Sequence, residues 1–346
     1  MSGIVSGMPP GHASRPAEDR QPATTAPASP PGPAAPPPRR LGAAALRQNS
    51  VYIAFALLVA FDLLVTPGFR NPTVVRSLLF EAAPVILIAL GQSLAIGTRG
   101  IDLSVGSVMA LSSATIGLTM DLDQGLAIGA AVAVGLLCGI LNGMLVAWLR
   151  IAPLISSLAL LVAARGLAQA MLGGARVDMP FDGPLSTIGQ LAPGGIPAVA
   201  MFSLLAALLF SFVVRRTVPG RYALFVGASR TAAVLAGHPV RATLGFVYGV
   251  SGLLAGIAGV FATARLGAAD ANYIGVQFEL DAIAAAVIGG TPLSGGRIST
   301  LGTVFGVLLL VVLDASFIMN NVNANYAQML KAAFIVGALF LRRGAA

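Results

Sequence analysis

The feature that most constrains this chain is a succession of apolar runs, each roughly 20 residues long, separated by short polar segments. Helical runs of this length match the thickness of the hydrocarbon layer of a bilayer. Of the 346 residues, 56% are hydrophobic and only 10% are charged, which is too little charge to cover the surface of a soluble protein. The sequence therefore predicts an all-α, polytopic membrane protein.

We expect about ten transmembrane helices. The predicted spans are residues 51–66, 73–97, 103–120, 125–149, 154–172, 197–214, 244–264, 276–290, 300–318 and 327–341. With the N-terminus in the cytoplasm, this topology puts most loop arginines inside and most loop aspartates outside, as the positive-inside rule requires. The span from residue 276 is short, and a re-entrant segment is the alternative; that alternative would place Arg342 and Arg343 outside.

The chain divides into a tail and a membrane domain. Its first 38 residues are rich in Pro, Ala, Ser and Gly and cannot bury enough apolar surface to fold. They also lack the continuous apolar region of a signal peptide. We therefore predict a disordered cytoplasmic tail over residues 1–48 and a transmembrane domain over residues 49–346.

Residues 97–107, GTRGIDLSVGS, place Arg99 and Asp102 between two apolar runs. Charged residues at membrane depth are costly and usually face a bundle interior or a water-filled path. Glycines permit a bend here, and Ser104 is expected to cap the following helix. We predict a broken-helix joint in which Arg99 neutralises Asp102.

Residues 289–297, GGTPLSGGR, predict a second joint of the same kind, with Leu293, Ser294 and Gly296 matching Leu103, Ser104 and Gly106. Two Gly-interrupted joints in a membrane chain indicate a transport path. The candidates for the path or its joints are Asp102, Ser104, Gly106, Glu279, Asp281, Gly289, Gly290, Gly295 and Gly296. Further polar candidates, for which helix packing is the alternative, are Gln92, Ser93, Asn142 and Ser251.

Small residues at four-residue spacing predict where helices pack closely in the membrane. In the fourth span they are Gly135, Gly139 and Gly143, and in the seventh they are Gly245 with Gly249 and Gly252 with Gly256. We interpret both sets as packing surfaces.

The longest predicted inner segment, residues 215–241, has five arginines around a short Ala-rich piece. It predicts an amphipathic helix at the cytoplasmic face, with a solvated anchor loop as the alternative. This segment, GRYALFVGASRTAAVLAG at 220–237, is one of three blocks that carry a resemblance; the others are GIDLSVGS at 100–107 and ELDAIAAAVIGGTPLSGGR at 279–297. From about residue 50 onward, the chain resembles the permease subunits of ribose-type monosaccharide ABC importers, the inner membrane components of binding-protein-dependent transport systems.

The resemblance implies the ABC importer permease fold and a multi-pass position in the bacterial inner membrane. It implies a non-enzymatic subunit that translocates a ribose-like pentose or hexose delivered by an extracytoplasmic binding protein, with no cofactor of its own. Cytoplasmic ATP-binding subunits and a second permease chain, in the simplest case a homodimer, are the implied partners. The docking segment, residues 215–241, would contact the ATP-binding subunit through Gly220, Arg221, Ala232, Ala233 and Gly237.

The sequence departs from the family pattern in and near the joints. Arg99 stands where a glycine is usual, Pro292 where serine is commoner and Ile298 where glycine is common. Residues 227–230 read GASR where an asparagine is usual. We expect these departures to bear on the substrate more than on the family.

The rival function is a proton-coupled secondary transporter. Its relay would use Glu81, Asp102, Asp281 or Asp314. Such a carrier needs no docking segment, which favours the importer. The single lysine, Lys331, follows no Gly-rich turn, so we expect ATP hydrolysis to come from another chain. An intramembrane enzyme is disfavoured because the sequence has no HExxH motif and its two histidines lie outside the apolar runs.

Overall fold

The computed structural model describes residues 49–180 and 182–342. The predicted tail, residues 1–48, lies outside the described residues. The described part is almost entirely helical. Its longer helices are α2 (Ser50–Val65), α3 (Pro72–Gly97), α4 (Val105–Thr119), α5 (Gln124–Ala147), α6 (Pro153–Met171), α8 (Ala198–Arg216), α11 (Val240–Leu266), α13 (Thr300–Met319) and α14 (Ala324–Arg342). Its shorter elements are β1 (Val177–Asp178), α7 (Pro184–Gln190), the 3-10 turn η1 (Pro193–Gly195), α9 (Val218–Ala228), α10 (Arg230–Leu235), β2 (Ala268–Ala269) and α12 (Phe278–Ile288).

Every predicted span coincides with one helix, because an apolar run at membrane depth must satisfy its own backbone hydrogen bonds. Six of these helices are long and apolar enough to cross a membrane on their own: α3, α5, α6, α8, α11 and α13. Helices α2 and α4 are apolar but shorter. A polytopic membrane protein is therefore consistent with the structure, and the number of ten crossings stays a prediction.

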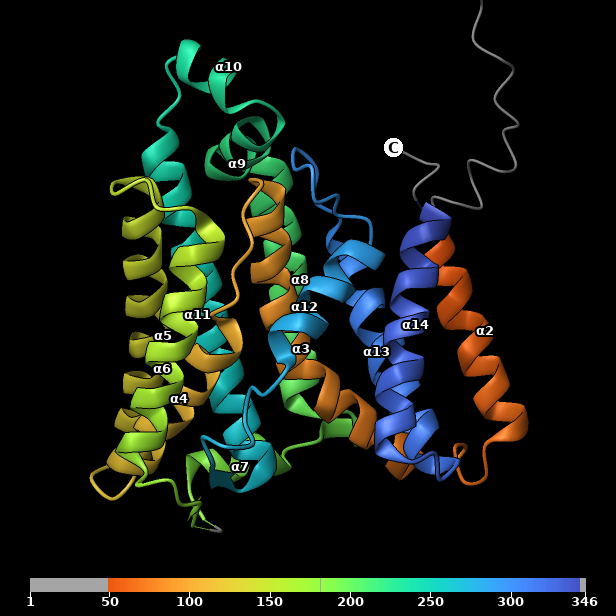
Figure 1. Ribbon diagram of the computed structural model, residues 1–346. Helices are drawn as coiled ribbons and strands as arrows, with labels where there is room; N and C mark the ends of the chain where they lie inside the picture. Colours follow the sequence, from red (N-terminus) through yellow and green to blue (C-terminus); the bar gives the residue numbers. More distant parts are fainter. Residues whose placement is uncertain (1–48, 181, 343–346) are drawn as a thin grey trace, which may run out of the picture. The chain divides into compact units, whose positions relative to one another are not determined.

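Two of the predicted spans are only partly helical. Helix α4 has 15 residues and α12 has 11, which correspond to lengths of about 22 Å and 16 Å. Figure 1 shows non-helical chain leading into each of them: residues 98–104 run from the α9 end of α3 back to α4, and residues 270–277 lead from β2 to α12. Non-helical backbone at membrane depth is tolerated where it is buried in protein or lines a cavity.

The centre of the bundle is formed by α3, of which every residue from Ala82 to Gly97 is buried. Helices α5 and α11 pack through their glycines: a Cβ added at Gly135 or Gly139 would overlap the backbone of Gly252. A Cβ added at Gly143 would lie 3.1 Å from the Cα of Gly245, which is a tight contact, whereas a Cβ added at Gly249 would meet only Ile140. The predicted small-residue surfaces are thus confirmed except at Gly249.

The connections gather at two ends of the bundle (Figure 1). At one end lie the α5–α6 loop, α9 and α10, with the arginines Arg150, Arg221, Arg230 and Arg241. At the other end lie α7 and the antiparallel pair in which Val177 of β1 is opposite Ala269 of β2. The aspartates Asp121, Asp123, Asp178, Asp182 and Asp270 belong to the connections at or beside α4–α5, β1, α7 and β2. The charge separation predicted from the sequence is therefore a separation in space.

Candidate functional site

The first joint, predicted over residues 97–107, is organised by Asp102, whose side chain is 1% exposed. Its Oδ1 accepts hydrogen bonds from the Ser104 hydroxyl at 2.6 Å, the Ser104 backbone N–H at 3.1 Å and the Asn142 amide at 3.3 Å. Its Oδ2 accepts one from the Ser251 hydroxyl at 2.9 Å. Asn142 in turn accepts from the Ser156 hydroxyl at 2.6 Å. Donors from Ser104, from α5 and from α11 thus converge on one carboxylate, and α6 supports the α5 donor through Ser156.

Two expectations about this joint are wrong. Ser104 stands at the N-terminus of α4 but makes no capping bond with its side chain, because its hydroxyl is committed to Asp102. Arg99 makes no ion pair with Asp102 within the described chain; it has a positive φ of 63° and points its guanidinium elsewhere. The Asp102 carboxylate therefore accepts hydrogen bonds from neutral donors. Several such bonds together can stabilise a buried carboxylate.

Arg99 connects the first joint to the end of α9. Its Nε donates to the Gly227 carbonyl at 2.7 Å, and its Nη2 donates to the Ala228 carbonyl at 2.6 Å. These carbonyls are among those that a helix leaves without an intrahelical partner, so the cation suits the C-terminal end of α9. A Cβ added at Gly227 would overlap the Gly97 carbonyl, which shows that α9 also lies directly against the end of α3.

The second joint, predicted over residues 289–297, is connected to the first by one backbone hydrogen bond. The N–H of Gly296 donates to the carbonyl of Gly97 at 2.9 Å. Gly290, Gly295 and Gly296 have φ values of 107°, 75° and 77°, a region that glycine adopts without steric cost. Gly289 lies so close to Gly302 of α13 that a side chain would overlap its backbone. The glycines predicted for this joint are therefore required by conformation or by close packing.

The residue-by-residue match between the joints does not hold in the structure. Ser104 is 2% exposed at the start of a helix, whereas Ser294 is exposed in a turn six residues before α13 begins at Thr300. Gly106 is the second residue of α4, whereas Gly296 lies in the connection. The residues that the two joints share in sequence favour turns in both places, but the two backbones have different conformations.

Glu279 lies where the short helices α4 and α12 meet. A Cβ added at Gly106 would overlap Glu279 Oε2 and the carbonyl of Gly275, so α4 begins directly against the start of α12. Glu279 Oε2 is buried and has no hydrogen-bond partner among the described residues. Arg165 of α6 donates to the carbonyls of Ala271, Ile274 and Gly275 at 2.7–2.9 Å. The turns before α12 are thus held in place by one guanidinium.

Asp281 takes part in a structural ion cluster rather than in a joint. Lys331 Nζ lies 2.8 Å from Asp281 Oδ1 and 2.8 Å from Asp314 Oδ2, which joins α12, α13 and α14. Glu81 lies 3.3 Å from Arg265 in a more exposed pair. Three of the four carboxylates that a proton relay would need are therefore occupied by cations.

The polar path candidates divide into two groups. Asn142 and Ser251 bind Asp102, and the hydroxyl of Ser93 donates to the Leu90 carbonyl at 2.7 Å, which is helix packing. Gln92 is fully buried, and neither atom of its amide has a hydrogen-bond partner in the described chain. Gln92 and Glu279 are thus the candidates that have buried side-chain atoms without a hydrogen-bond partner in the described chain.

The docking segment contains two short helices, α9 and α10, which meet at Ser229. Gly220 is buried against the backbone of α8, because a side chain there would overlap Val213 and Val214. Arg221 and Ala232 are exposed, whereas Ala233 is fully buried. Gly237 is exposed with a φ of 73°, and a Cβ added there would meet no atom within 4 Å.

Arg165 and Lys331 were not among the predicted site residues, although the same signal could have found them. Both are single charges inside predicted spans, which is the criterion that selected Asp102. The link from Arg99 to α9 joins residues 128 positions apart, and no local pattern indicates it.

The chain is similar to known transport proteins along most of its length. Residues 74–339 match the family model described as "branched-chain amino acid transport system / permease component". The chain is 36% identical over 301 residues to the galactofuranose transporter permease protein YtfT of Escherichia coli (strain K12), covering 84% of this chain and 88% of that protein. It is 36% identical over 299 residues to the ribose import permease protein RbsC of Bacillus subtilis (strain 168), covering 84% and 91%.

A third relative is the fructose import permease protein FruF of Bifidobacterium longum (strain NCC 2705), with 35% identity over 276 residues covering 78% of this chain and 77% of that protein. No solved structure matches the chain. The family match covers both joints and the docking segment, and the relatives confirm the resemblance to permeases of sugar ABC importers. This multi-pass membrane protein belongs to the branched-chain amino acid transport system / permease component family.

Proposed function

We propose that this chain is the membrane-spanning subunit of an ATP-driven importer that translocates a monosaccharide, a ribose-like pentose or a hexose. The three relatives named above import ribose, fructose or galactofuranose by their names, which supports a sugar as cargo. An extracytoplasmic binding protein delivers the sugar, and two cytoplasmic ATP-binding subunits drive a pair of permease chains.

The observation that carries this proposal is the contact between α9 and both joints. Gly227 and Ala228 accept hydrogen bonds from Arg99 of the first joint, and Gly227 lies against Gly97. Gly97 accepts the hydrogen bond from Gly296 of the second joint. A displacement of the docking segment by a partner would therefore reach both partly helical crossings through packed backbone. A proton-coupled carrier has no use for such a connection.

Two docking residues make this coupling testable. Arg221 is exposed on α9, so Arg221→Glu reverses a charge on the contact surface without changing a buried residue. Arg216 lies at the start of the docking segment but on α8, outside the five predicted contact residues, so Arg216→Glu is the matched control for a charge reversal within the segment. Gly237→Trp adds bulk, and Gly237→Asn controls for its positive φ, which Asn tolerates.

The experiment measures ATPase stimulation and uptake of ribose, fructose and galactofuranose in vesicles that contain the permease, the ATP-binding subunits and the binding protein. We expect Arg221→Glu and Gly237→Trp to lower both activities several-fold, with near wild-type values for the controls. Wild-type coupling in Arg221→Glu and Gly237→Trp, with normal assembly, would show that the energy enters elsewhere. A measured mass with one permease chain for two ATP-binding subunits would refute the pair of permeases.

A further inference from the structure

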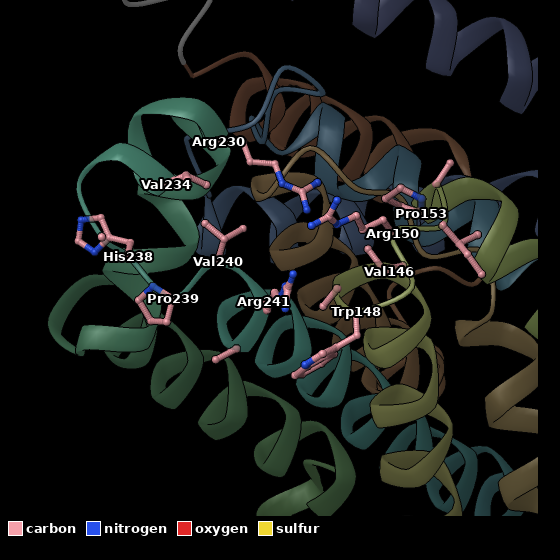
Figure 2. A pocket seen from close by; sticks show the side chains of 15 residues that line it. Val146, Trp148, Arg150, Pro153, Arg230, Val234, His238, Pro239, Val240 and Arg241 are labelled. Atoms are coloured by element: carbon pink, nitrogen blue, oxygen red, sulfur yellow. The ribbon is translucent and has the colours of Figure 1, made fainter.

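A cavity lies at the arginine-rich end of the bundle, between the α5–α6 loop and the α10–α11 connection. Its volume is about 880 Å³. Three arginines line it, Arg150, Arg230 and Arg241, and no acidic side chain does. Figure 2 shows Arg150 and Arg230 extending toward one another, with Trp148 and Arg241 beside them.

These arginines have no anion of their own. Within the described chain none of the three makes a salt bridge or a side-chain hydrogen bond. Like charges that face one another in a shared cavity repel, and a bound anion removes the repulsion. Arg150 also has a positive φ of 59°, which is uncommon for a residue with a side chain, and it lines the cavity.

An apolar groove between α5 and α11 lies next to this cavity. A second cavity of about 230 Å³ is lined only by apolar residues, among them Leu136, Ile140, Phe246 and Val250. The ring of Trp148 bridges the two cavities, because it lines the first and lies over Gly245, which lines the second. Arg241 and Val250 are nine residues apart on one helix, so the combined site extends about 13 Å into the bundle.

We propose that this combined site binds one anionic phospholipid, with its phosphate between Arg150 and Arg230 and an acyl chain in the groove between α5 and α11. The charge pattern places the site on the side that faces the cytoplasmic leaflet, where anionic lipids concentrate. Tryptophan at such a boundary contacts the headgroup region with its N–H and the acyl chains with its ring. An acidic loop of a protein would match the arginines but leave the apolar groove empty.

Trp148 is the only tryptophan of the chain, so its fluorescence reports directly on this site. The experiment compares the full chain in bilayers that contain phosphatidylglycerol or phosphatidylcholine, each brominated on the acyl chain, at equal mole fractions. We expect brominated phosphatidylglycerol to quench Trp148 at several-fold lower mole fraction. Equal quenching by the two lipids would overturn the proposal. This comparison is made on the unsubstituted chain.

Two variants separate the headgroup from the tail. Arg150→Gln/Arg230→Gln should abolish the preference for phosphatidylglycerol, and Arg215→Gln/Arg216→Gln, which removes two exposed arginines at the end of α8, should keep it. Gly249→Leu should weaken quenching by filling the groove, since only Ile140 lies near a side chain there; Gly129→Leu on an open face of α5 is its control. Equal effects of a variant and its control would contradict the site.

Soluble inorganic phosphate distinguishes a free anion from a lipid. At 10 mM or below, on the order of physiological concentrations, it should leave the quenching by phosphatidylglycerol unchanged, because apolar burial adds affinity that phosphate alone lacks. Displacement of the lipid by phosphate would show a simple anion site. Displacement by the ATP-binding subunit would show that the arginines serve a protein contact.

Discussion

Asp102 is the residue on which the first joint depends, and it is held without a cation. Replacing it by Ala removes the acceptor of Ser104, Asn142 and Ser251 at once. Because buried donors without partners are costly, we expect Asp102→Ala to destabilise the protein by about 1–3 kcal/mol. Asp102→Asn, which keeps an acceptor oxygen, should cost less. Thermal unfolding in detergent measures both, with the exposed Asp121→Ala as control; equal stabilities of Asp102→Ala and the control would contradict the network.

The carboxylates that a proton relay would use distinguish an ATP-driven importer from a proton-coupled carrier. A relay needs carboxylates that face a shared cavity, and Glu81, Asp281 and Asp314 are instead paired with Arg265 or Lys331. We therefore expect uptake into vesicles to require ATP and to persist when a protonophore abolishes the pH gradient. Uptake without ATP that collapses with the protonophore would replace the importer by the carrier.

At the scale of elements, the contact of α9 with the two joints can be used to test how motion is transmitted from the docking segment to the bundle. Gly227→Ala adds one methyl group where a Cβ would overlap the Gly97 carbonyl, so α9 must move away from α3. We expect assembly with the ATP-binding subunits to be kept, and sugar uptake per ATP hydrolysed to fall about tenfold, a barrier change of roughly 1.4 kcal/mol. Gly129→Ala, where a side chain meets open space, is the control. Unchanged coupling in Gly227→Ala would exclude this contact as the route.

Lys331 tests how the last helix is attached. Lys331→Met leaves Asp281 and Asp314 without their shared cation, and their mutual repulsion should loosen α14. The side chains are 16–37% exposed, so solvent screens the pair and we expect a modest loss of about 1–2 kcal/mol. The triple variant Lys331→Met/Asp281→Asn/Asp314→Asn should recover most of it. Chemical unfolding followed by circular dichroism measures the stability of each variant. A triple variant that is less stable than Lys331→Met would contradict the role of Lys331 as the shared cation.

The sequence predicts the elements well and their contacts poorly, for a physical reason. Apolar runs and glycine clusters are local signals, and they locate every long helix and both joints to within a few residues. The partners of Arg99 and Asp102 come from segments up to 149 positions away, and only the packed bundle brings them together. The expected pairing of Arg99 with Asp102 was wrong because proximity in sequence is a weak guide once a chain bends between two residues.

At the scale of the whole molecule, the separation of charges predicts how the chain sits in the membrane. With ten crossings, Asn323 after α13 faces outward and Leu235, 83% exposed on α10, faces the cytoplasm. Single cysteines at these positions, in a Cys138→Ser background, should react differently with an impermeant thiol reagent. Only Asn323→Cys should be labelled in intact cells, and both should be labelled after the membrane is opened. Labelling of Leu235→Cys in intact cells would contradict the topology.

The single hydrogen bond between Gly296 and Gly97 has a consequence for the time course of transport. Because each joint contacts the other as well as α9, neither can change conformation while the other keeps its place. Packed backbone is bistable rather than continuously deformable, so a state with one joint shifted should not accumulate. Probes placed on residues 98–104 and on residues 290–296 should then relax with one common rate constant after ATP is added, because both joints change conformation in the same step.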